Sequence, residues 1–280
     1  MYIDNRKKKE HYGISGKVII TVVITNFNRA KFVLRAIRSV LTQPGFAHPH
    51  EIILVDDASD DNSISLISAE FQDELEIGVL KLVKNKINLG VTGSKNRGFQ
   101  CASGNWVIFL DSDDFLNINV WTPMSKSLNQ SKENPIVFFR CSNLFGQFVG
   151  KSFDGDVYLN LERYLTHTSY GEALTAVNKS LVKSEPYISE LRGYEGLGCC
   201  RLINKHGAAR LSTIVARCYD QTGADRLSMP KPFMRRMRLL SIGHGMLISE
   251  FGGSMTLRKK IGCRIKQALY YLAGTIYELF

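Results

Sequence analysis

Three carboxylates lie within four residues at Asp111-Ser-Asp113-Asp114, directly after the apolar run Trp106–Leu110. Five consecutive bulky apolar residues predict a strand buried on both faces of a parallel sheet. Ligands of open α/β sheets bind where such strands end. Hard oxygen ligands suit Mg²⁺ or Mn²⁺, ions that usually accompany a phosphate-bearing substrate. The alternative interpretation is an acidic turn that caps a following helix.

The strand that carries these acids is the last of four predicted strands that alternate with helices. The other three are residues 18–25, 52–55 and 79–83. Apolar residues at helical spacing predict a helix between Arg29 and Pro44. The glycine-spaced stretch 88–98 is expected to be a loop, followed by a short helix to Ala102. This alternation predicts right-handed βαβ units and a parallel sheet, an α/β fold.

After Asp114 the pattern becomes mixed. Strands are predicted at residues 136–140, 174–177 and 211–218, and a helix at 194–205. The last fifty residues are predicted to be helical, with a break at Gly252-Gly253. The sequence therefore predicts a nucleotide-type half, a mixed half and a helical tail.

Composition places the chain among proteins that bury a substantial core. Hydrophobic residues make up 44% of the 280 positions and charged residues 22%, both ordinary values for a globular protein. The six cysteines form no C-x-x-C pair and match no zinc-ligand spacing. Together with the polar start at residues 1–10, this cysteine usage predicts a cytoplasmic protein in a reducing environment.

The net charge of +10 is concentrated near the carboxyl terminus. Residues 231–266 contain nine Lys or Arg against the single acid Glu250, an excess of +8. This distribution predicts a local anionic partner and argues against a nucleic-acid-binding face across the protein. Residues 258–279 repeat apolar side chains at helical spacing, which predicts a basic amphipathic helix in a membrane interface. The alternative is packing against the core or against another copy.

Three phosphate-binding classes fit poorly. The turn after the first strand contains no glycine, which a dinucleotide-binding motif requires. Gly93 and Gly98 have the spacing of a P-loop, but Phe99-Gln100 replace its lysine and hydroxyl. A phosphatase of the haloacid-dehalogenase type places its Asp pair after the first strand, whereas here the pair follows the fourth.

Four elements in order resemble the family 2 glycosyltransferases with the GT-A fold. Thr25–Arg29 resembles the family's T-x-Y-N-R turn, and Val55–Asp61 resembles its V-D-D-x-S-x-D element. Asn88–Gly98 is similar to N-x-G-x-x-x-A-R-N-x-G, and Phe109–Asp114 is similar to the D-x-D metal motif. The family's arginine in the third element is Lys95 here. A compact ammonium group therefore replaces a planar guanidinium group at the expected nucleotide contact.

The resemblance implies a role for each polar residue at the sheet edge. Asp57 binds the nucleotide base, and its alternative role is to cap the helix that follows it. Asp111 binds the ribose or a metal-bound water, and Asp113 binds the Mn²⁺ or Mg²⁺ that bridges the two phosphates. Thr25 and Asn28 contact the nucleotide from the end of the first strand. The implied cofactor is therefore Mn²⁺ or Mg²⁺, and the implied substrate is a nucleotide-diphosphate sugar.

The resemblance also implies an inverting transfer, in which a general base removes the proton of an acceptor hydroxyl. Family members carry Glu-Asp at the start of a helix in this region, and this chain has Glu195-Gly196. Glu195 is therefore the candidate base, with stabilisation of the helix N-terminus as its alternative role. In related enzymes a loop in this region closes over the diphosphate, and Arg226 is the candidate for that contact here. The alternative is that Arg226 belongs to a surface turn.

The implied organisation has four parts. These are a basic N-terminal segment (1–16), a nucleotide-sugar-binding half (17–114), an acceptor-binding half (115–230) and a basic amphipathic helical tail (231–280). The implied function is sugar transfer to a hydroxyl of a growing, lipid-linked surface polysaccharide, with the tail on the inner face of the cell membrane. The alternatives are a transferase for a soluble or protein acceptor, and a non-catalytic nucleotide-sugar-binding protein, which Gly196 motivates.

Overall fold

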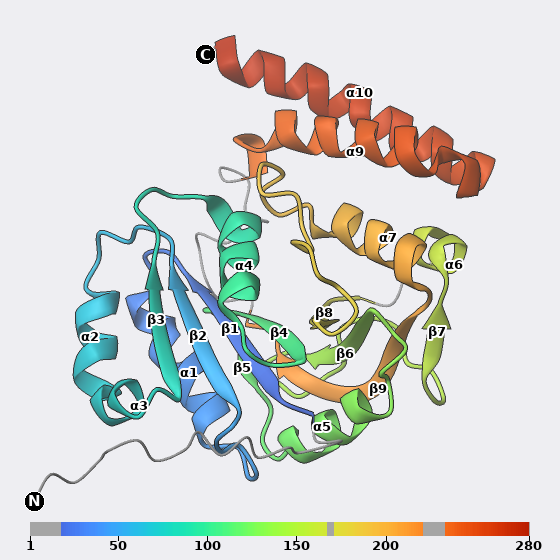
Figure 1. Ribbon diagram of the computed structural model, residues 1–280. Helices are drawn as coiled ribbons and strands as arrows, with labels where there is room; N and C mark the ends of the chain where they lie inside the picture. The colour runs from blue at the N-terminus through green and yellow to red at the C-terminus, as the bar shows by residue number, and fades with distance from the viewer. Residues whose placement is uncertain (1–17, 167–170, 221–232, 280) are drawn as a thin grey trace, which may run out of the picture.

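The computed structural model describes residues 18–166, 171–220 and 233–279 (Figure 1). Its nine strands form one sheet in the order β3-β2-β1-β4-β8-β6-β9-β5, with β7 paired to β9 outside this path. The first four strands in this order are parallel. They are β3 (Leu80–Lys84), β2 (Glu51–Asp56), β1 (Ile20–Asn26) and β4 (Trp106–Asp111). The predicted α/β class and parallel first half are confirmed.

The second half of the sheet is mixed, as the sequence predicts. β8 (Ala173–Asn178) is antiparallel to β4 and to β6 (Ile136–Ser142), whereas β6 and β9 (Ala209–Cys218) are parallel. All three strands lie within two residues of their expected bounds. Two short strands, β5 (Phe115–Leu116) and β7 (Val157–Leu159), are absent from the prediction, because segments of two or three residues carry no periodic pattern.

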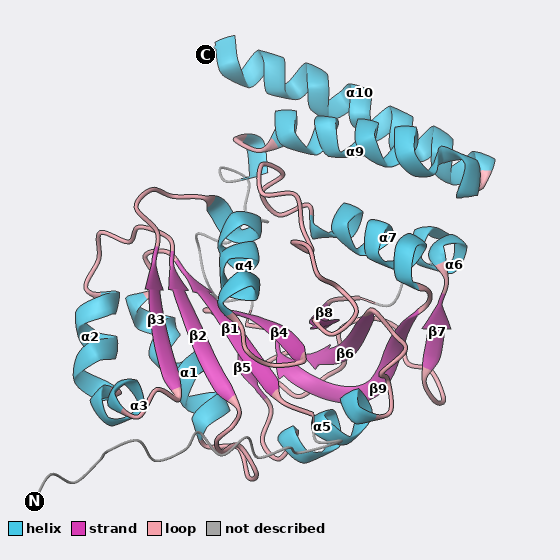
Figure 2. Ribbon diagram, viewed as in Figure 1, coloured by secondary structure: helices cyan, strands magenta, loops and turns pink. Residues whose placement is uncertain are grey.

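Helices cover both faces of the sheet (Figure 2). One face carries α1 (Ala30–Leu41), α2 (Ser63–Glu70), the adjoining α3 (Gln72–Glu76) and α5 (Trp121–Asn129). The other carries α4 (Gly90–Cys101), α6 (Leu161–Thr166) and α7 (Glu195–His206). Side chains of β1 alternate between the two cores, since Val22 and Ile24 join the first and Val23 joins the second. Burial on both faces explains why these strands are continuously apolar.

Residues 90–98 of the glycine-spaced stretch are helical, so the prediction of a loop is wrong for them. The predicted helix to Ala102 is confirmed, since α4 ends at Cys101. Gly90 begins α4 with a φ of +78°, a backbone conformation that favours glycine. Gly98 lies on the sheet, where an added Cβ would come within 2.3 Å of Val23 Cγ1. Gly90 therefore starts the helix, and Gly98 allows its close approach to β1. The spacing of glycines alone does not distinguish such a helix from a loop.

The tail folds into an antiparallel pair of helices, α9 (Met237–Phe251) and α10 (Leu257–Leu279), joined by the 3-10 turn η2 (Gly252–Ser254) (Figure 1). The predicted helices and their break are confirmed. Arg238, near the start of α9, pairs with Glu278, near the end of α10, at 3.0 Å. The apolar residues Leu247 and Phe251 join α9 to Leu197 of α7. Across the described ranges, no helix combines the length and apolarity that crossing a bilayer requires.

Candidate active site

The carboxyl ends of β1, β2 and β4 meet at one edge of the sheet. In the parallel register Thr25 lies opposite both Val55 and Asp111, and Asn26 lies opposite Asp56. The first turn, the V-D-D element and the D-x-D motif therefore share this edge. It is the edge at which ligands of open α/β sheets bind.

Asp57 holds the start of α4 in place. Its side chain is buried and accepts hydrogen bonds from the amides of Leu89 at 2.7 Å and Gly90 at 2.8 Å. The side-chain amide of Asn85 donates to it at 2.9 Å. The carboxylate thus satisfies orphan amides at the N-terminus of α4. The alternative role, a cap on the following helix α2, is wrong, because the carboxylate bonds the start of α4, whereas Asp61 accepts the bond from the Ser63 amide at the start of α2.

Asn28 connects the first two loops of the site. It has a φ of +54°, which asparagine tolerates better than most residues. Its Oδ1 accepts a hydrogen bond from the Asp60 amide at 2.9 Å, and its own amide donates to Ser59 Oγ at 3.0 Å. These bonds bring the turn after β1 against the acidic loop after β2.

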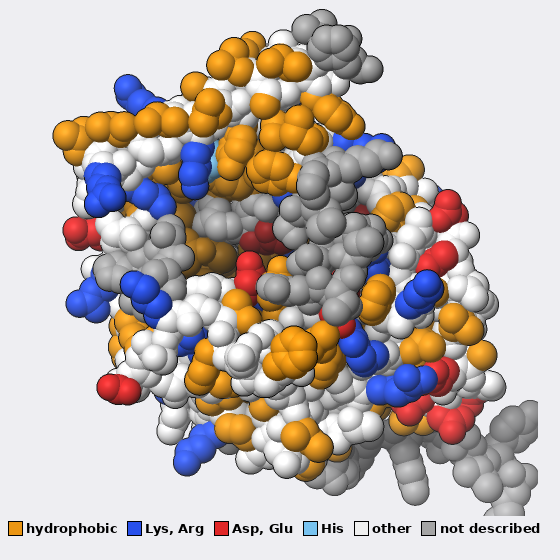
Figure 3. Space-filling view, turned by 180° about the vertical axis from the view of Figure 1, so that it is seen from behind, with side chains coloured by type: hydrophobic (Ala, Val, Ile, Leu, Met, Phe, Trp, Pro, Cys, Tyr) orange, Lys and Arg blue, Asp and Glu red, His pale blue; other side chains and the backbone are white. Residues whose placement is uncertain are grey.

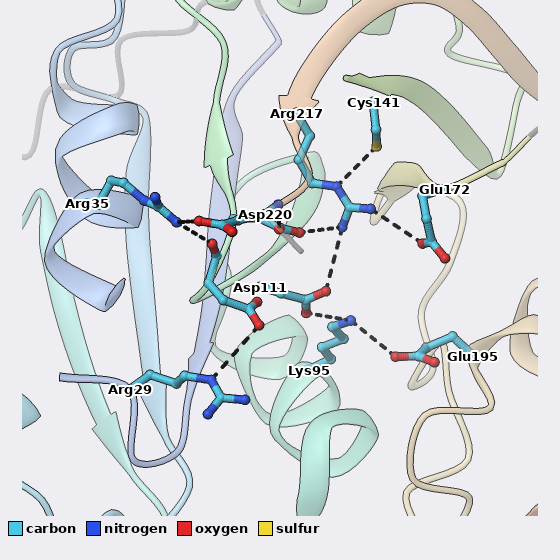
Figure 4. A network of polar contacts seen from close by, with 11 residues as sticks. Arg29, Arg35, Lys95, Asp111, Cys141, Glu172, Glu195, Arg217 and Asp220 are labelled. Atoms are coloured by element: carbon cyan, nitrogen blue, oxygen red, sulfur yellow. Dashed lines mark hydrogen bonds and ion pairs between the residues drawn. The ribbon is translucent and has the colours of Figure 1, made fainter. Parts of the chain in front are cut away.

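Lys95 joins the two halves of the site (Figure 4). This side chain of α4 lies 3.0 Å from an oxygen of Asp111 on β4 and 3.1 Å from Oε1 of Glu195 on α7. Burial acts to lower the pKa of Lys95, but the two carboxylates outweigh it and raise the pKa above its usual value. Burial likewise acts to raise the pKa of Asp111, which Lys95 and Arg217 hold below its usual value. Lys95 is therefore a fixed cation between the D-x-D motif and the start of α7.

Arg217, near the end of β9, is a second buried cation and belongs to none of the sequence motifs. Its guanidinium lies 3.0 Å from Asp114, 3.6 Å from Asp111 and 3.5 Å from Glu172. It also donates to Cys141 Sγ at 3.1 Å. The available signal is a charged residue within the apolar run 214–218 of β9, since an arginine is almost never buried without a partner.

Asp113 and Asp114 differ in their surroundings. Burial and the neighbouring Asp111 raise the pKa of Asp113, which forms an ion pair with Arg29 at 4.0 Å. Burial raises the pKa of Asp114 to about 7, although Arg217 acts to lower it. Asp114 also accepts a hydrogen bond from the Asp220 amide at 2.9 Å. The short strand β5 follows Asp114, so the interpretation of the acidic turn as a helix cap is wrong.

The charges of the site fit an additional cation. Six carboxylates and four cations form this network within the described part of the chain. No group of three or more His, Cys, Asp or Glu side chains there is arranged to hold a metal by itself. Burial, followed by the charge of Asp111, disfavours the charged form of Asp113, and a cation beside this carboxylate would offset both effects. A divalent ion held by Asp113 and by phosphate oxygens of a substrate would supply that cation, an arrangement typical of Mg²⁺.

Glu195 is the first residue of α7, and its side chain points toward Lys95 (Figure 4). Its Oε1 receives the lysine bond, and no described residue hydrogen-bonds its Oε2. An added Cβ at Gly196 would meet only Tyr164 Oη, at 3.9 Å, so packing does not require a glycine there. Arg226 lies outside the described residues.

A mixed α/β sheet with a D-x-D turn at its carboxyl edge is the arrangement of the GT-A transferases. The solved mannosyltransferase PcManGT from Pyrobaculum calidifontis, in complex with GDP-Man and Mn²⁺, has this fold and superposes with a TM-score of 0.63. That superposition has 13% identity and covers 94% of this chain and 74% of the other. The model of glycosyl transferase family 2 matches residues 21–162, about half of the chain. The protein belongs to glycosyl transferase family 2.

Two bacterial relatives are similar over part of the chain. The GalNAc(5)-diNAcBac-PP-undecaprenol beta-1,3-glucosyltransferase of Campylobacter jejuni is 29% identical over 181 residues, which cover 63% of this chain and 57% of that protein. The succinoglycan biosynthesis protein ExoO of Rhizobium meliloti is 35% identical over 95 residues, which cover 34% of this chain and 25% of that protein. This chain thus spans little more than half of the first relative.

Proposed function

We propose that the protein transfers a sugar from a nucleotide-diphosphate sugar to a hydroxyl of an acceptor saccharide, with Mn²⁺ or Mg²⁺. The observation that carries this proposal is the contact of one buried ammonium, Lys95, with both Asp111 and Glu195. Asp111 belongs to the nucleotide edge of the sheet, and Glu195 belongs to the half expected to bind the acceptor. Transfer needs a metal-binding carboxylate beside the leaving diphosphate and a base beside the acceptor hydroxyl, and this contact joins the two segments that carry the candidates.

The roles in the donor half follow from position. Asp113 holds the divalent ion, which supplies charge neutralisation for the departing diphosphate. Asp57 is the proposed partner of the nucleotide base, and the hydrogen bonds that it accepts from the amides of Leu89 and Gly90 fix its orientation. Thr25, Asn28 and Lys95 complete the nucleotide side of the site. Arg226 is kept as the proposed contact to the diphosphate.

An inverting reaction fits the placement of Glu195. Glu195 Oε2 accepts the proton of the acceptor hydroxyl while the hydroxyl oxygen forms a bond to the anomeric carbon of the donor sugar. The bond from that carbon to the diphosphate breaks at the same time, and its electron pair leaves with the diphosphate. Lys95, bonded to Oε1, orients the carboxylate throughout.

A lipid-linked acceptor is the proposed substrate class. Its support is the Campylobacter relative, whose name gives a saccharide on a PP-undecaprenol carrier. A growing surface polysaccharide is supported by the succinoglycan relative. Transfer by this chain to such an acceptor at the inner face of the cell membrane is part of the proposal.

Replacement of Asp113 by Asn is expected to abolish metal-dependent donor binding. The charge that holds the ion is lost while the side-chain shape is kept, so donor hydrolysis should fall about 100-fold or more. The measurement is thermal shift and slow hydrolysis of a panel of uridine- and guanosine-diphosphate sugars, with Mn²⁺ and with chelator. Asp60→Asn, which removes an exposed acid of the neighbouring loop, is the matched control.

Three outcomes separate the alternatives. Stabilisation by one donor that disappears with chelator and in Asp113→Asn supports the proposal. Binding without any hydrolysis or transfer favours the non-catalytic protein. No response of the wild type to any donor with metal would contradict the assignment of the D-x-D motif.

The outer side of α10 supports a membrane position for the tail. Ile265, Leu269, Leu272 and Ile276 recur at helical spacing, and each is more than half exposed. Figure 3 shows hydrophobic side chains gathered along the helical pair, with Lys and Arg side chains beside them. Apolar side chains with flanking cations match an anionic lipid interface. We therefore assign this face to the membrane surface.

Replacement of Leu269 and Leu272 by Glu is expected to release the protein from anionic vesicles. Each leucine contributes apolar burial in the interface, and each glutamate adds repulsion, so the partition coefficient should fall at least about tenfold. Sedimentation with vesicles of phosphatidylcholine and phosphatidylglycerol, against phosphatidylcholine alone, measures this. Ile77→Glu, at an even more exposed apolar position beside α3, is the control. Equal binding of the double variant would place the membrane contact elsewhere.

A further inference from the structure

A cavity of about 840 Å³ lies between the sheet, α7 and the α9–α10 pair. Most of its walls are apolar, and its volume is in the range of ligand-binding pockets. The apolar wall residues include Phe138, Leu165, Leu197, Leu211 and Leu247. The cavity is thus built by the second half of the sheet and bordered by the tail.

One wall of the cavity is the candidate base. Glu195 and Gly196 line it at the start of α7, and Thr175 of β8 lines it from the sheet. Because Glu195 also contacts Lys95 and through it Asp111, the cavity adjoins the proposed site of transfer. A molecule that fills the cavity can therefore present a hydroxyl to Glu195.

The opposite wall is cationic. Arg258, Lys259 and Lys266 of α10 line the cavity, and none of them forms an ion pair with another residue of the described ranges. They contrast with Arg238, which pairs with Glu278 on the same helical hairpin. Cations without a protein partner beside an apolar cavity attract an anionic ligand.

His244 adds no charge to this wall near neutral pH. Burial, followed by the charges of Lys266 and Lys259, lowers the pKa of His244 to about 4. Its Nδ1 lies 3.1 Å from Tyr194 Oη, and its ring stacks on Tyr270. Both lysines therefore act on the same cavity-wall side chain and disfavour its charged form.

We propose that this cavity binds the phosphate-bearing end of a lipid-linked acceptor, with Lys259, Lys266 and Arg258 around the phosphate. The apolar walls contact the first part of the lipid chain, and the saccharide extends toward Glu195. The exposed apolar side of α10 lies on the same helix, so the lipid passes from membrane to cavity along one element. The inference deepens the proposed function and rests on it for the role of Glu195.

Binding of farnesyl diphosphate, a short lipid diphosphate, tests the site directly. Titrations are made in chelator, which removes metal-assisted binding at the donor edge. Lys259→Ala/Lys266→Ala is expected to weaken binding at least about tenfold through lost charge-assisted bonds. Lys260→Ala/Arg264→Ala removes the same charge from the same helix outside the cavity, and should change the Kd by less than about twofold.

Two further probes separate the sources of affinity. Inorganic pyrophosphate carries the charge without the lipid, and farnesol carries the lipid without the charge. Each is expected to bind the wild type at least about tenfold more weakly than farnesyl diphosphate. An equal loss of affinity for farnesyl diphosphate in both double variants would show that only the general surface charge attracts the ligand, and would overturn the proposal. If pyrophosphate binds as tightly as farnesyl diphosphate, the proposed contact between the apolar walls and the lipid chain is wrong.

The proposed function fails in a different way. It fails if no donor is bound or cleaved, a result that leaves the binding of farnesyl diphosphate and its dependence on Lys259 and Lys266 intact. The cavity proposal fails if replacement of those two lysines leaves the Kd for farnesyl diphosphate unchanged. That result leaves donor hydrolysis and its dependence on Asp113 intact. The two readouts use different ligands and different residues.

Discussion

Replacement of Glu195 by Gln is expected to lower kcat about a thousandfold and to leave the KM for the donor within about twofold. General-base catalysis contributes about 10²- to 10⁴-fold, and glutamine cannot accept the proton of the acceptor hydroxyl. Glutamine keeps the shape of the side chain and can still accept a hydrogen bond from Lys95, whose bond to Glu195 Oε1 measures 3.1 Å. The loss should therefore appear in the chemical step.

Steady-state transfer with varied donor and varied acceptor measures this effect. Glu190→Gln, an exposed carboxylate shortly before α7, is the control and should retain wild-type kcat. An unchanged kcat in Glu195→Gln would remove Glu195 from the role of base. A change in donor KM without a change in kcat would make Glu195 a binding residue.

Replacement of Arg217 by Met is expected to lower the free energy of unfolding by about 3–5 kcal/mol. Loss of one partner of a buried ion pair leaves an uncompensated charge in the interior. Arg217 faces Asp111 and Asp114, and both its side chain and that of Asp114 are almost fully buried. The methionine fills similar space but supplies no charge to either carboxylate.

Urea unfolding at neutral pH measures the difference. Arg201→Met is the matched control, because Arg201 pairs with Glu250 at 2.6 Å in an exposed position, where ion pairs contribute about 0–1 kcal/mol. Arg217→Lys retains the charge and serves where the methionine variant does not fold. Equal losses in Arg217→Met and Arg201→Met would show that the buried network contributes no more than a surface pair.

Local patterns predict the sheet edge well. The strand before Asp111 and the strand before Asp56 each show a continuous apolar run with a turn after it, so their ends and their acids are readable from the sequence. The four strands of the first half lie within two residues of the expected bounds. Parallel pairing then places the acids at one edge without further information.

The contacts across the site are not readable in the same way. Lys95 and Glu195 are 100 positions apart in the chain, and Arg217 and Asp111 are farther apart still. No local pattern encodes such pairings, because they depend on how the second half of the sheet pairs with the first. The first part of α4 is taken for a loop for a different reason, since Gly90 and Gly98 reduce helix propensity while packing stabilises the helix.

The position of Lys95 has a consequence for how the two substrates influence each other. The ammonium group of Lys95 balances the charges of both Asp111 and Glu195. A ligand that binds to Asp111 therefore changes the electrostatic field at Glu195. Thermodynamic linkage makes this effect reciprocal: a donor that alters acceptor affinity by some factor has its own affinity altered by the same factor. Communication between the two binding events then needs no domain closure, because a single shared charge is sufficient.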